Sequence, residues 1–232
     1  MVQVGRYPHY AAAMSGTTYT YLPGIFDVAT QDDAMRIILT PEDSTTQHRW
    51  ATETPYFADL IASAISLSDR SLVLDYGCGI GRMAKALIDR HGCRVIGVDI
   101  SPSMRALAVG YVASDNFFAC PPEMLDVLIA RGLTCDAALS IWVLQHCPQL
   151  VEDIKRIAGA LTPGGELFVV NQGHRAVPTV ERGWMDDGLD VAALLRMAFD
   201  QRAGGPLSAA NTTPLLARVA TWATYRRREP RG

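Results

Sequence analysis

The sequence predicts an α/β protein built on an open, mostly parallel sheet with helices on both faces. From residue 71 onward, short apolar runs alternate with segments of helical periodicity, and two runs, "SLVLDYG" and "VIGVDIS", end close to an acid. Alternating strands and helices produce right-handed βαβ units, which form a parallel sheet covered on both sides. With 232 residues, of which 49% are hydrophobic, the chain can bury the core of one large domain.

Residues 1–50 differ from the rest, because they lack long periodicity and carry tyrosines and turn pairs such as Pro23-Gly24. We expect an N-terminal extension here, long enough to fold over the sheet as a lid, followed by the sheet domain over 51–232. A helix is expected to begin at Pro55, since Thr54 can cap it and proline suits the first helical position. Its apolar face would consist of Tyr56, Phe57, Leu60, Ile61, Ala64 and Ile65.

The elements of the sheet domain follow in order along the chain. Helices are expected at 81–92, 101–112, 121–132, 149–161 and 190–199. Gly92 and Gly132 are placed to end two of these helices, and Ser101 can cap the one that starts at Pro102. A strand between 200 and 213 is not clear from the pattern. Strands are expected at 71–77, 93–100, 116–119, 135–144, 163–172 and near 217–226.

Composition excludes several classes of protein. The net charge is −3 and the only basic run closes the chain, so we read that run as a solvated terminus and expect no nucleic-acid partner. Five widely spaced cysteines without a C-x-x-C pair argue against disulfides and against a metal site. No segment resembles a signal peptide or a membrane span, so we expect a cytoplasmic protein without membrane attachment. The oligomeric state stays open.

The stretch "DYGCGIG" places three glycines directly behind the first expected strand. Open parallel sheets bind ligands at the carboxyl ends of their strands, so this turn lies where a ligand belongs. Gly77, Gly79 and Gly81 form a G-x-G-x-G pattern, and Arg82 stands where a dinucleotide fingerprint needs its last glycine. Asp75 at the strand tip would repel a phosphate and attract a cation. The expected ligand therefore carries positive charge near this turn.

A second acid, Asp99, closes the second expected strand. An acid at this place can accept hydrogen bonds from both hydroxyls of a ribose. A ribose with a cation nearby and no phosphate describes S-adenosylmethionine. Helix capping is the alternative role that we keep for both Asp75 and Asp99.

From about residue 70 to 171 the sequence resembles the class I S-adenosylmethionine-dependent methyltransferases. The resemblance rests on "VLDYGCGIGRM" and "VIGVDIS", and it extends to "CDAALSIWVLQHCP" and "LTPGGELFVVNQ". It implies a Rossmann-like fold and a methyl transfer that leaves S-adenosylhomocysteine. Another nucleotide-binding sheet remains the alternative.

The resemblance also assigns cofactor positions. It implies that the loop of Gly77, Cys78, Gly79 and Gly81 holds the methionine part, that Asp75 receives the amino group, and that Asp99 binds the ribose. Glu123 is the nearest candidate for the adenine amino group, but it is displaced from the usual place of an acid in this family. We interpret Cys78 as a small residue that fits the loop and not as a nucleophile. Trp142 can belong to the core as well as contact the cofactor. Further contacts are expected from Ile100, Met104, Ser140, Ile141 and Trp142.

His146 follows the fourth expected strand in "WVLQHC". Similar methyltransferases carry a histidine in this region, so His146 is a candidate general base that removes a proton from the acceptor. A structural histidine bonded to the backbone is the alternative. Methyl transfer depends mainly on alignment with a good leaving group, so no further catalytic pair is required.

The acceptor is expected to be a small molecule, because no D-P-P-Y or N-P-P-Y signature follows the fourth strand. A protein acceptor, a catalytically inert cofactor-binding partner protein and a nicotinamide oxidoreductase are the alternatives. His48 is a further candidate for lining the lid. Arg175 is expected to meet a carboxylate or phosphate. The candidate acceptor contacts are Trp50, Tyr56, Asn171, His174, Arg175 and Trp184.

Overall fold

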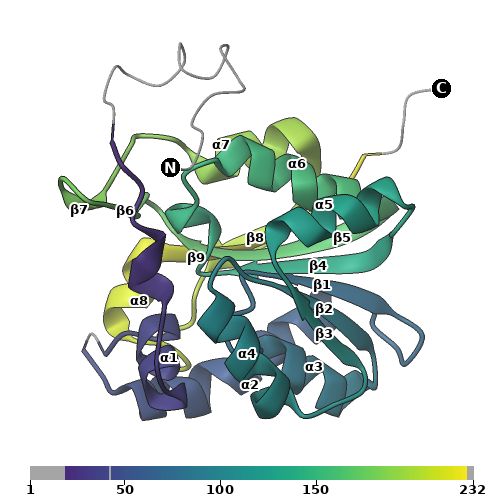
Figure 1. Cartoon of the computed structure of the whole chain (residues 1–232), viewed down its shortest axis with the longest axis horizontal. Helices are drawn as coiled ribbons and strands as arrows, with labels where there is room; N and C mark the ends of the chain where they lie inside the picture. The colour runs from purple at the N-terminus through teal and green to yellow at the C-terminus, as the bar shows by residue number, and fades with distance from the viewer. Residues whose placement is uncertain (1–18, 42, 229–232) are drawn as a thin grey trace.

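In the computed structural model, which describes residues 19–41 and 43–228, a seven-stranded sheet carries helices on both faces (Figure 1). The strand order is β3-β2-β1-β4-β5-β9-β8, and the first five strands in this order are parallel. This confirms the predicted fold class. The strands are β1 (Leu72–Tyr76), β2 (Arg94–Val98), β3 (Phe117–Cys120), β4 (Cys135–Ile141), β5 (Leu161–Gln172), β8 (Phe199–Pro206) and β9 (Ala220–Arg227).

The strand order reverses between β1 and β4, which are neighbours although β2 and β3 lie between them in the chain. The connections run through helices on both sides, so the turns after β1, β2 and β4 open at the same edge of the sheet. These helices are α3 (Arg82–His91), α4 (Pro102–Val112), α5 (Pro122–Ala130), α6 (Leu150–Ala160) and α7 (Val191–Ala198). Gly92 ends α3, and Ser101 caps α4 by accepting a hydrogen bond from the Met104 amide, as predicted.

The strand that the sequence left unclear is β8, which pairs antiparallel with β9 at the edge of the sheet. Seven of its eight residues are exposed or half-buried, and a bulge interrupts its register between Gln201 and Ala203. An edge strand of this kind has no alternation of apolar and polar residues to reveal it. The predicted last strand begins later than expected because α8 (Pro214–Val219) takes its first residues.

The helix predicted to begin at Pro55 begins nine residues earlier, as α2 (Thr46–Ala64). Thr45 is its cap and accepts a hydrogen bond from the His48 amide at 3.1 Å. Pro55 therefore lies inside the helix, and Thr54 donates its hydroxyl to the Trp50 carbonyl instead of capping. Proline is tolerated because this turn faces solvent, where water can replace the lost hydrogen bond.

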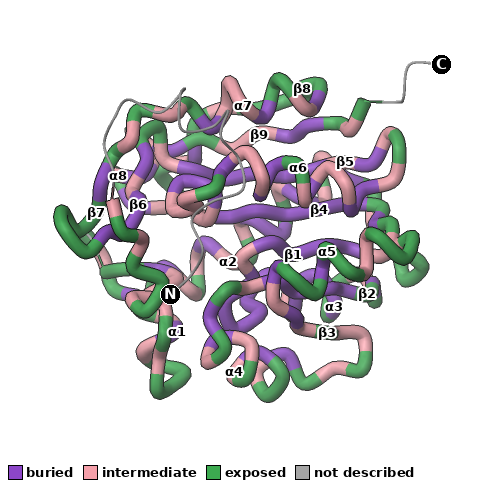
Figure 2. Tube along the Cα trace, turned by 45° about the horizontal axis from the view of Figure 1, so that its top comes forward, coloured by how far each residue is buried: buried purple, intermediate pink, exposed green. Residues whose placement is uncertain are grey.

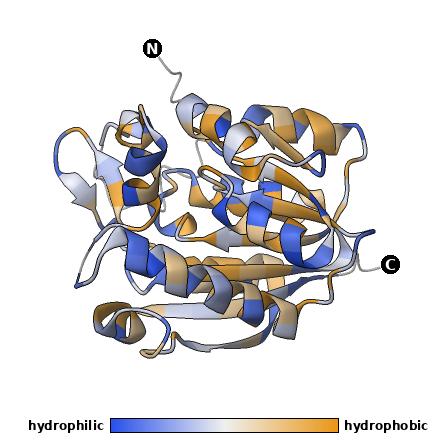
Figure 3. Ribbon diagram, turned by 90° about the horizontal axis from the view of Figure 1, so that it is seen from below, coloured by the Kyte–Doolittle hydropathy of each residue, from blue (hydrophilic) through white to orange (hydrophobic). Residues whose placement is uncertain are grey.

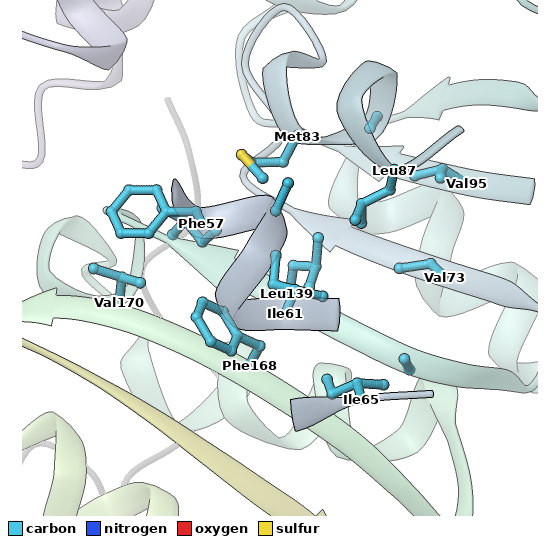
Figure 4. Packing of buried hydrophobic residues seen from close by; sticks show 14 of the residues in the cluster. Phe57, Ile61, Ile65, Val73, Met83, Leu87, Val95, Leu139, Phe168 and Val170 are labelled. Carbon is cyan, nitrogen blue, oxygen red and sulfur yellow. The ribbon is translucent and has the colours of Figure 1, made fainter. Parts of the chain in front are cut away.

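The hydrophobic core has two parts, one on each face of the sheet. On one face Phe57 and Ile61 of α2 pack with Leu87 of α3 against Val73 and Phe168 (Figure 4). On the other face Leu74 and Leu167 meet residues of α6 and α7. β4 is buried over most of its length, and apolar residues follow the central strands and the helices beside them (Figures 2 and 3). The sheet is therefore rigidly held at the edge where β1, β2 and β4 end.

Two segments far apart in the sequence meet above that edge. The first contains η1 (Pro23–Phe26) and α1 (Gln31–Ile38), and the second is a hairpin of β6 (Val177–Thr179) and β7 (Gly183–Met185). Tyr21 bridges to Thr179 in antiparallel fashion, and the Leu22 amide donates to the Pro178 carbonyl at 3.0 Å. We call residues 19–40 together with 177–185 the roof (Figure 1). Of the tyrosines in the N-terminal extension, Tyr7 and Tyr10 lie outside the described residues.

No helix in the described part of the chain has the length and apolar character needed to cross a membrane. All five cysteines are free thiols.

Gly81→Ala tests the turn that starts α3. The glycine has a φ of 81°, and a Cβ there would lie 2.4 Å from Cγ2 of Val112. We expect a loss of about 2–4 kcal/mol in the free energy of unfolding, from the left-handed backbone and the overlap together. The matched control is Gly110→Ala in α4, where no atom lies within 4 Å and alanine should stabilise the helix by about 0.5–1 kcal/mol. Urea unfolding of the two variants measures both effects, and equal stability of the two would contradict this account.

Candidate functional site

A cavity of about 540 Å³ lies at the carboxyl ends of β1, β2 and β4, beneath the roof. Its volume falls in the range of pockets that hold small ligands, roughly 300–1,000 Å³. Eight of the predicted cofactor residues line it, and Trp184 is the predicted acceptor residue that lines it. The eight are Gly77, Gly79, Asp99, Ile100, Met104, Glu123, Ile141 and Trp142.

The glycine loop is tightly packed against the protein itself. A Cβ on Gly77 would lie 2.2 Å from a methyl group of Val143, and a Cβ on Gly79 would lie 2.6 Å from Cδ1 of Ile38. Both glycines also have a positive φ. The space beside these two glycines is therefore already filled by a side chain of the loop after β4 and by one of α1. Cys78 is buried away from the cavity, and burial raises its pKa well above the ordinary value, so it stays a neutral thiol.

Asp99 fixes the geometry of the loop. Its Oδ2 accepts a hydrogen bond from the Gly79 amide at 2.8 Å, and its Oδ1 accepts one from the Ser101 amide at 2.9 Å. Burial raises the pKa of Asp99, while these two amides oppose the shift. Each oxygen keeps a lone pair, and the side chain lines the cavity. Asp99 can therefore accept hydrogen bonds from a pair of hydroxyl groups.

Asp75 lies beneath the loop and does not line the cavity. Its Oδ2 is buried and has no hydrogen-bond partner among the described residues. Burial raises the pKa of Asp75 to about 7, and the guanidinium of Arg82 opposes that shift. An unpartnered carboxylate oxygen at this place fits the positive ligand group that the sequence predicted, because a cation nearby would favour its charged form.

Arg49 of α2 lines the cavity and was missed by the sequence analysis. Its Nε donates to Glu53 Oε1 at 2.6 Å, and its Nη1 donates to the Thr40 carbonyl at 2.6 Å. Glu53 is fully buried behind it, so the positive partner of this ion pair faces the cavity. The guanidinium keeps N–H groups beyond those used, and they can meet an anion. The R-x-x-x-E spacing alone reads as an ordinary surface pair on a helix, which is why the sequence did not reveal the residue.

His146 lies in the short helix η2 (Leu144–His146) after β4 and lines the cavity. Its Nδ1 is 2.6 Å from the Ala176 carbonyl, so Nδ1 carries the proton and Nε2 holds the lone pair. Nε2 accepts from the Gln145 side-chain amide at 3.1 Å. Desolvation lowers the pKa of His146. His146 can therefore be bonded to the backbone through Nδ1 and still offer Nε2 as a base. The structural role and the role of general base do not exclude each other.

Trp142 shows a backbone outlier at the cavity wall. It has a φ of 64°, which is rare for a bulky residue, and its Nε1 is buried without a partner among the described residues. The indole packs edge-on against Phe57. Ser140 and Gly81, also predicted to touch the cofactor, do not line the cavity, and Ser140 is fully buried.

Five of the six predicted acceptor contacts lie away from the cavity wall, and Arg175, the fifth, is described separately below. Trp50 donates its Nε1–H to the Tyr111 hydroxyl, and the guanidinium of Arg82 lies over its ring. The Tyr56 hydroxyl accepts from the Ser208 amide at 3.0 Å. Asn171 is buried in β5, and His174 is exposed on the loop after it. His48, the further lid candidate, is exposed as well.

Arg175 was predicted to meet a carboxylate or phosphate of the acceptor, and the structure corrects this. Its side chain is fully buried and pairs with Asp187 at 2.8 Å. It also donates to the carbonyls of Leu144 and Cys147, at 2.6 and 2.7 Å. These two carbonyls flank His146, so Arg175 holds the histidine loop in place and has a structural role.

Arg175→Met should therefore act on stability. Removing the guanidinium leaves Asp187 buried and unpaired, and we expect a loss of about 3–5 kcal/mol in the free energy of unfolding. Arg36→Ala, which breaks the exposed pair with Asp33, is the matched control and should change stability little. Urea unfolding measures both. Full stability of Arg175→Met would contradict the structural role.

Fold and site together define an α/β domain with a cavity at the point where the strand order reverses, which is where open parallel sheets bind their ligands. Residues 74–169 match the sequence model of a methyltransferase domain. The chain is 35% identical over 118 residues to a trans-aconitate 2-methyltransferase of Rhodopseudomonas palustris, and this match covers 48% of the chain and 42% of the relative. It is 27% identical over 127 residues to a malonyl-[acyl-carrier protein] O-methyltransferase of Enterobacter lignolyticus, with 55% and 49% covered. The chain thus spans about half the length of these relatives.

Solved structures agree on the fold. The N-methyltransferase NodS of Bradyrhizobium japonicum, determined with S-adenosyl-L-homocysteine, superimposes with a TM-score of 0.58 at 16% identity. The match covers 84% of this chain and 97% of NodS. By the region that matches a methyltransferase domain and by its fold, the chain resembles the class I S-adenosylmethionine-dependent methyltransferases.

Proposed function

We propose that the protein transfers a methyl group from S-adenosylmethionine to an oxygen or nitrogen atom of a small molecule by in-line displacement. The observation that carries the proposal is the position of Asp99. It lines the cavity where the strand order reverses, and each of its carboxylate oxygens can accept one more hydrogen bond. The methionine part of the cofactor carries an ammonium and a carboxylate group. The unpartnered Oδ2 of Asp75 can attract the ammonium group, and the N–H groups of Arg49 can bind the carboxylate.

In this arrangement Asp99 holds the ribose hydroxyls, Arg49 holds the methionine carboxylate, and Asp75 acts on the amino group from beneath the loop. Ile100, Met104 and Glu123 surround the adenine. Pro121 and Pro122 after β3 have no backbone N–H, so Glu123 is the polar group available from that turn. Ile141 and Trp142 border the sulfonium. When bound, the cofactor supplies a methyl group on a good leaving group.

His146 is the proposed general base, since its Nε2 holds a lone pair at the cavity wall. The lid predicted from residues 1–50 corresponds in this proposal to the roof, which adds the β6–β7 hairpin and would exclude water and confine the acceptor. A small-molecule acceptor fits a cavity of about 540 Å³ beneath the roof better than a protein segment does. A cytoplasmic location is proposed from the five free thiols, which suit a reducing compartment.

Titration calorimetry with S-adenosylhomocysteine tests the cofactor. We expect wild-type protein to bind it, and Asp99→Ala to weaken binding by about ten- to a hundredfold, because the ribose hydroxyls lose a charged partner. Asp89→Ala removes an exposed carboxylate on α3 and is the control that should bind like the wild type. Absence of heat with the wild type would overturn the proposal. Binding without methyl transfer to any acceptor would instead favour an inert cofactor-binding protein.

The pH dependence of methyl transfer tests His146. Because desolvation lowers the pKa of His146, the base stays neutral at physiological pH, and kcat/KM should fall only at pH values below the ordinary histidine range. His146→Gln should lower kcat by about 10²–10⁴-fold and remove the acid limb of the profile. S-adenosylhomocysteine affinity serves as the control and should not change. An unaltered profile in the variant would exclude the histidine as the base.

A further inference from the structure

We infer that the methyl acceptor is an uncharged aromatic compound with a hydroxyl group, bound against the rings of Phe26, His146 and Trp184. This inference rests on the proposed function and names the substrate class of the same site. We call these three residues the ring cluster.

The ring cluster joins three distant segments at the cavity. Phe26 comes from η1, His146 from η2 and Trp184 from β7, and all three line the cavity. The ring centroids are 6.1 Å apart for Phe26 and His146, 6.3 Å for Phe26 and Trp184, and 5.2 Å for His146 and Trp184. The interplanar angles are 55°, 64° and 56°, so no two rings are stacked on each other. Ring faces remain available to a flat ligand.

The rings are held in place by the pairing of the roof. The Leu22 amide donates to the Pro178 carbonyl and the Val180 amide donates to the Thr20 carbonyl, which brings η1 beside the hairpin. Trp184 is 52% exposed, so one part of its surface faces solvent at the mouth of the cavity. An aromatic ligand that stacks on Trp184 would cover exposed apolar surface and gain ring contacts at the same time.

The charges around the ring cluster are already neutralised. Arg175 is the charged side chain that lowers the pKa of His146, and it is paired with Asp187. On the cavity wall Asp153 pairs with Arg156 at 2.9 Å. The other charged residues of the cavity wall are Arg49, Asp99 and Glu123, and the proposed cofactor contacts use all three. With the cofactor in place, a carboxylate or ammonium group on the acceptor would lose its water at the rings without gaining a free charged partner from the cavity wall, which is costly.

A hydroxyl group matches the one basic atom in the ring cluster. His146 Nε2 accepts a hydrogen bond now, and an acceptor hydroxyl can replace the Gln145 amide as its donor. As the oxygen–methyl bond forms, the sulfur–methyl bond breaks with its electron pair left on sulfur, and the hydroxyl proton passes to Nε2. The products are a methyl ether, neutral S-adenosylhomocysteine and an imidazolium that releases its proton to solvent.

Three probes with one ring system separate charge from shape: 2-naphthol, 2-naphthoate and 2-naphthylmethylamine. Their binding to the protein saturated with S-adenosylhomocysteine is measured by calorimetry. We expect 2-naphthol to bind at least about tenfold more tightly than either charged probe. Trp184→Ala should weaken 2-naphthol about tenfold, while Trp184→Phe should retain most of the affinity because it keeps a ring. Met197→Ala, an exposed residue of α7 away from the cavity, is the control without effect.

The outcomes distinguish this inference from the proposed function. If 2-naphthoate or 2-naphthylmethylamine bound as tightly as 2-naphthol or more tightly, the acceptor class would be overturned. Binding of S-adenosylhomocysteine by the same protein would still support the proposed cofactor. The acceptor class would also be overturned if none of the probes bound, or if Trp184→Ala bound 2-naphthol like the wild type. Failure of the wild type to bind S-adenosylhomocysteine would overturn the proposed function itself.

Discussion

The carboxylate of Asp99 holds together the glycine loop beneath the cavity and, through Ser101, the roof above it. One oxygen holds the Gly79 amide and the other holds the Ser101 amide, so the ends of β1 and β2 are fixed to each other. The Ser101 hydroxyl then donates to Asp27 at 2.9 Å, and the Val28 amide donates to the Ser103 hydroxyl. A continuous set of hydrogen bonds therefore connects the glycine loop to the segment between η1 and α1. A ligand that engages Asp99 would act on the loop and the roof together.

Arg175 anchors the opposite side of the site in a comparable way. Its guanidinium joins the two carbonyls around His146 to Asp187, which follows the β6–β7 hairpin. Because a buried guanidinium requires several partners, these three segments keep one mutual arrangement. The position of His146 thus depends on a residue that never reaches the cavity. Phe26 and Trp184 meet the histidine only because the N-terminal segment and the hairpin are paired with each other.

The sequence predicted the parts of the fold that local patterns encode. Buried parallel strands ending in an acid, and helices with Ser101 and Gly92 at their ends, carry their own signals. α2 was misplaced because Pro55 imitates a helix start, although its solvent-facing position lets it sit inside one. The edge strand β8 lacks a buried face, so no periodicity marks it. The predicted acceptor residues divide for another reason: Trp184 lines the cavity and Arg175 is buried away from it, and this difference is a property of the tertiary structure.

The resemblance to methyltransferases and the proposed choice of acceptor depend on different parts of this chain. The matched region, residues 74–169, contains Asp75, Asp99 and His146, but the roof lies outside it on both sides. Phe26 precedes that region and Trp184 follows it. The elements of the proposed cofactor site can therefore stay constant while the two flanking segments change the chemistry above them. Proteins that share the matched region can therefore differ in the molecule that they methylate, because Phe26 and Trp184 of the ring cluster lie outside that region.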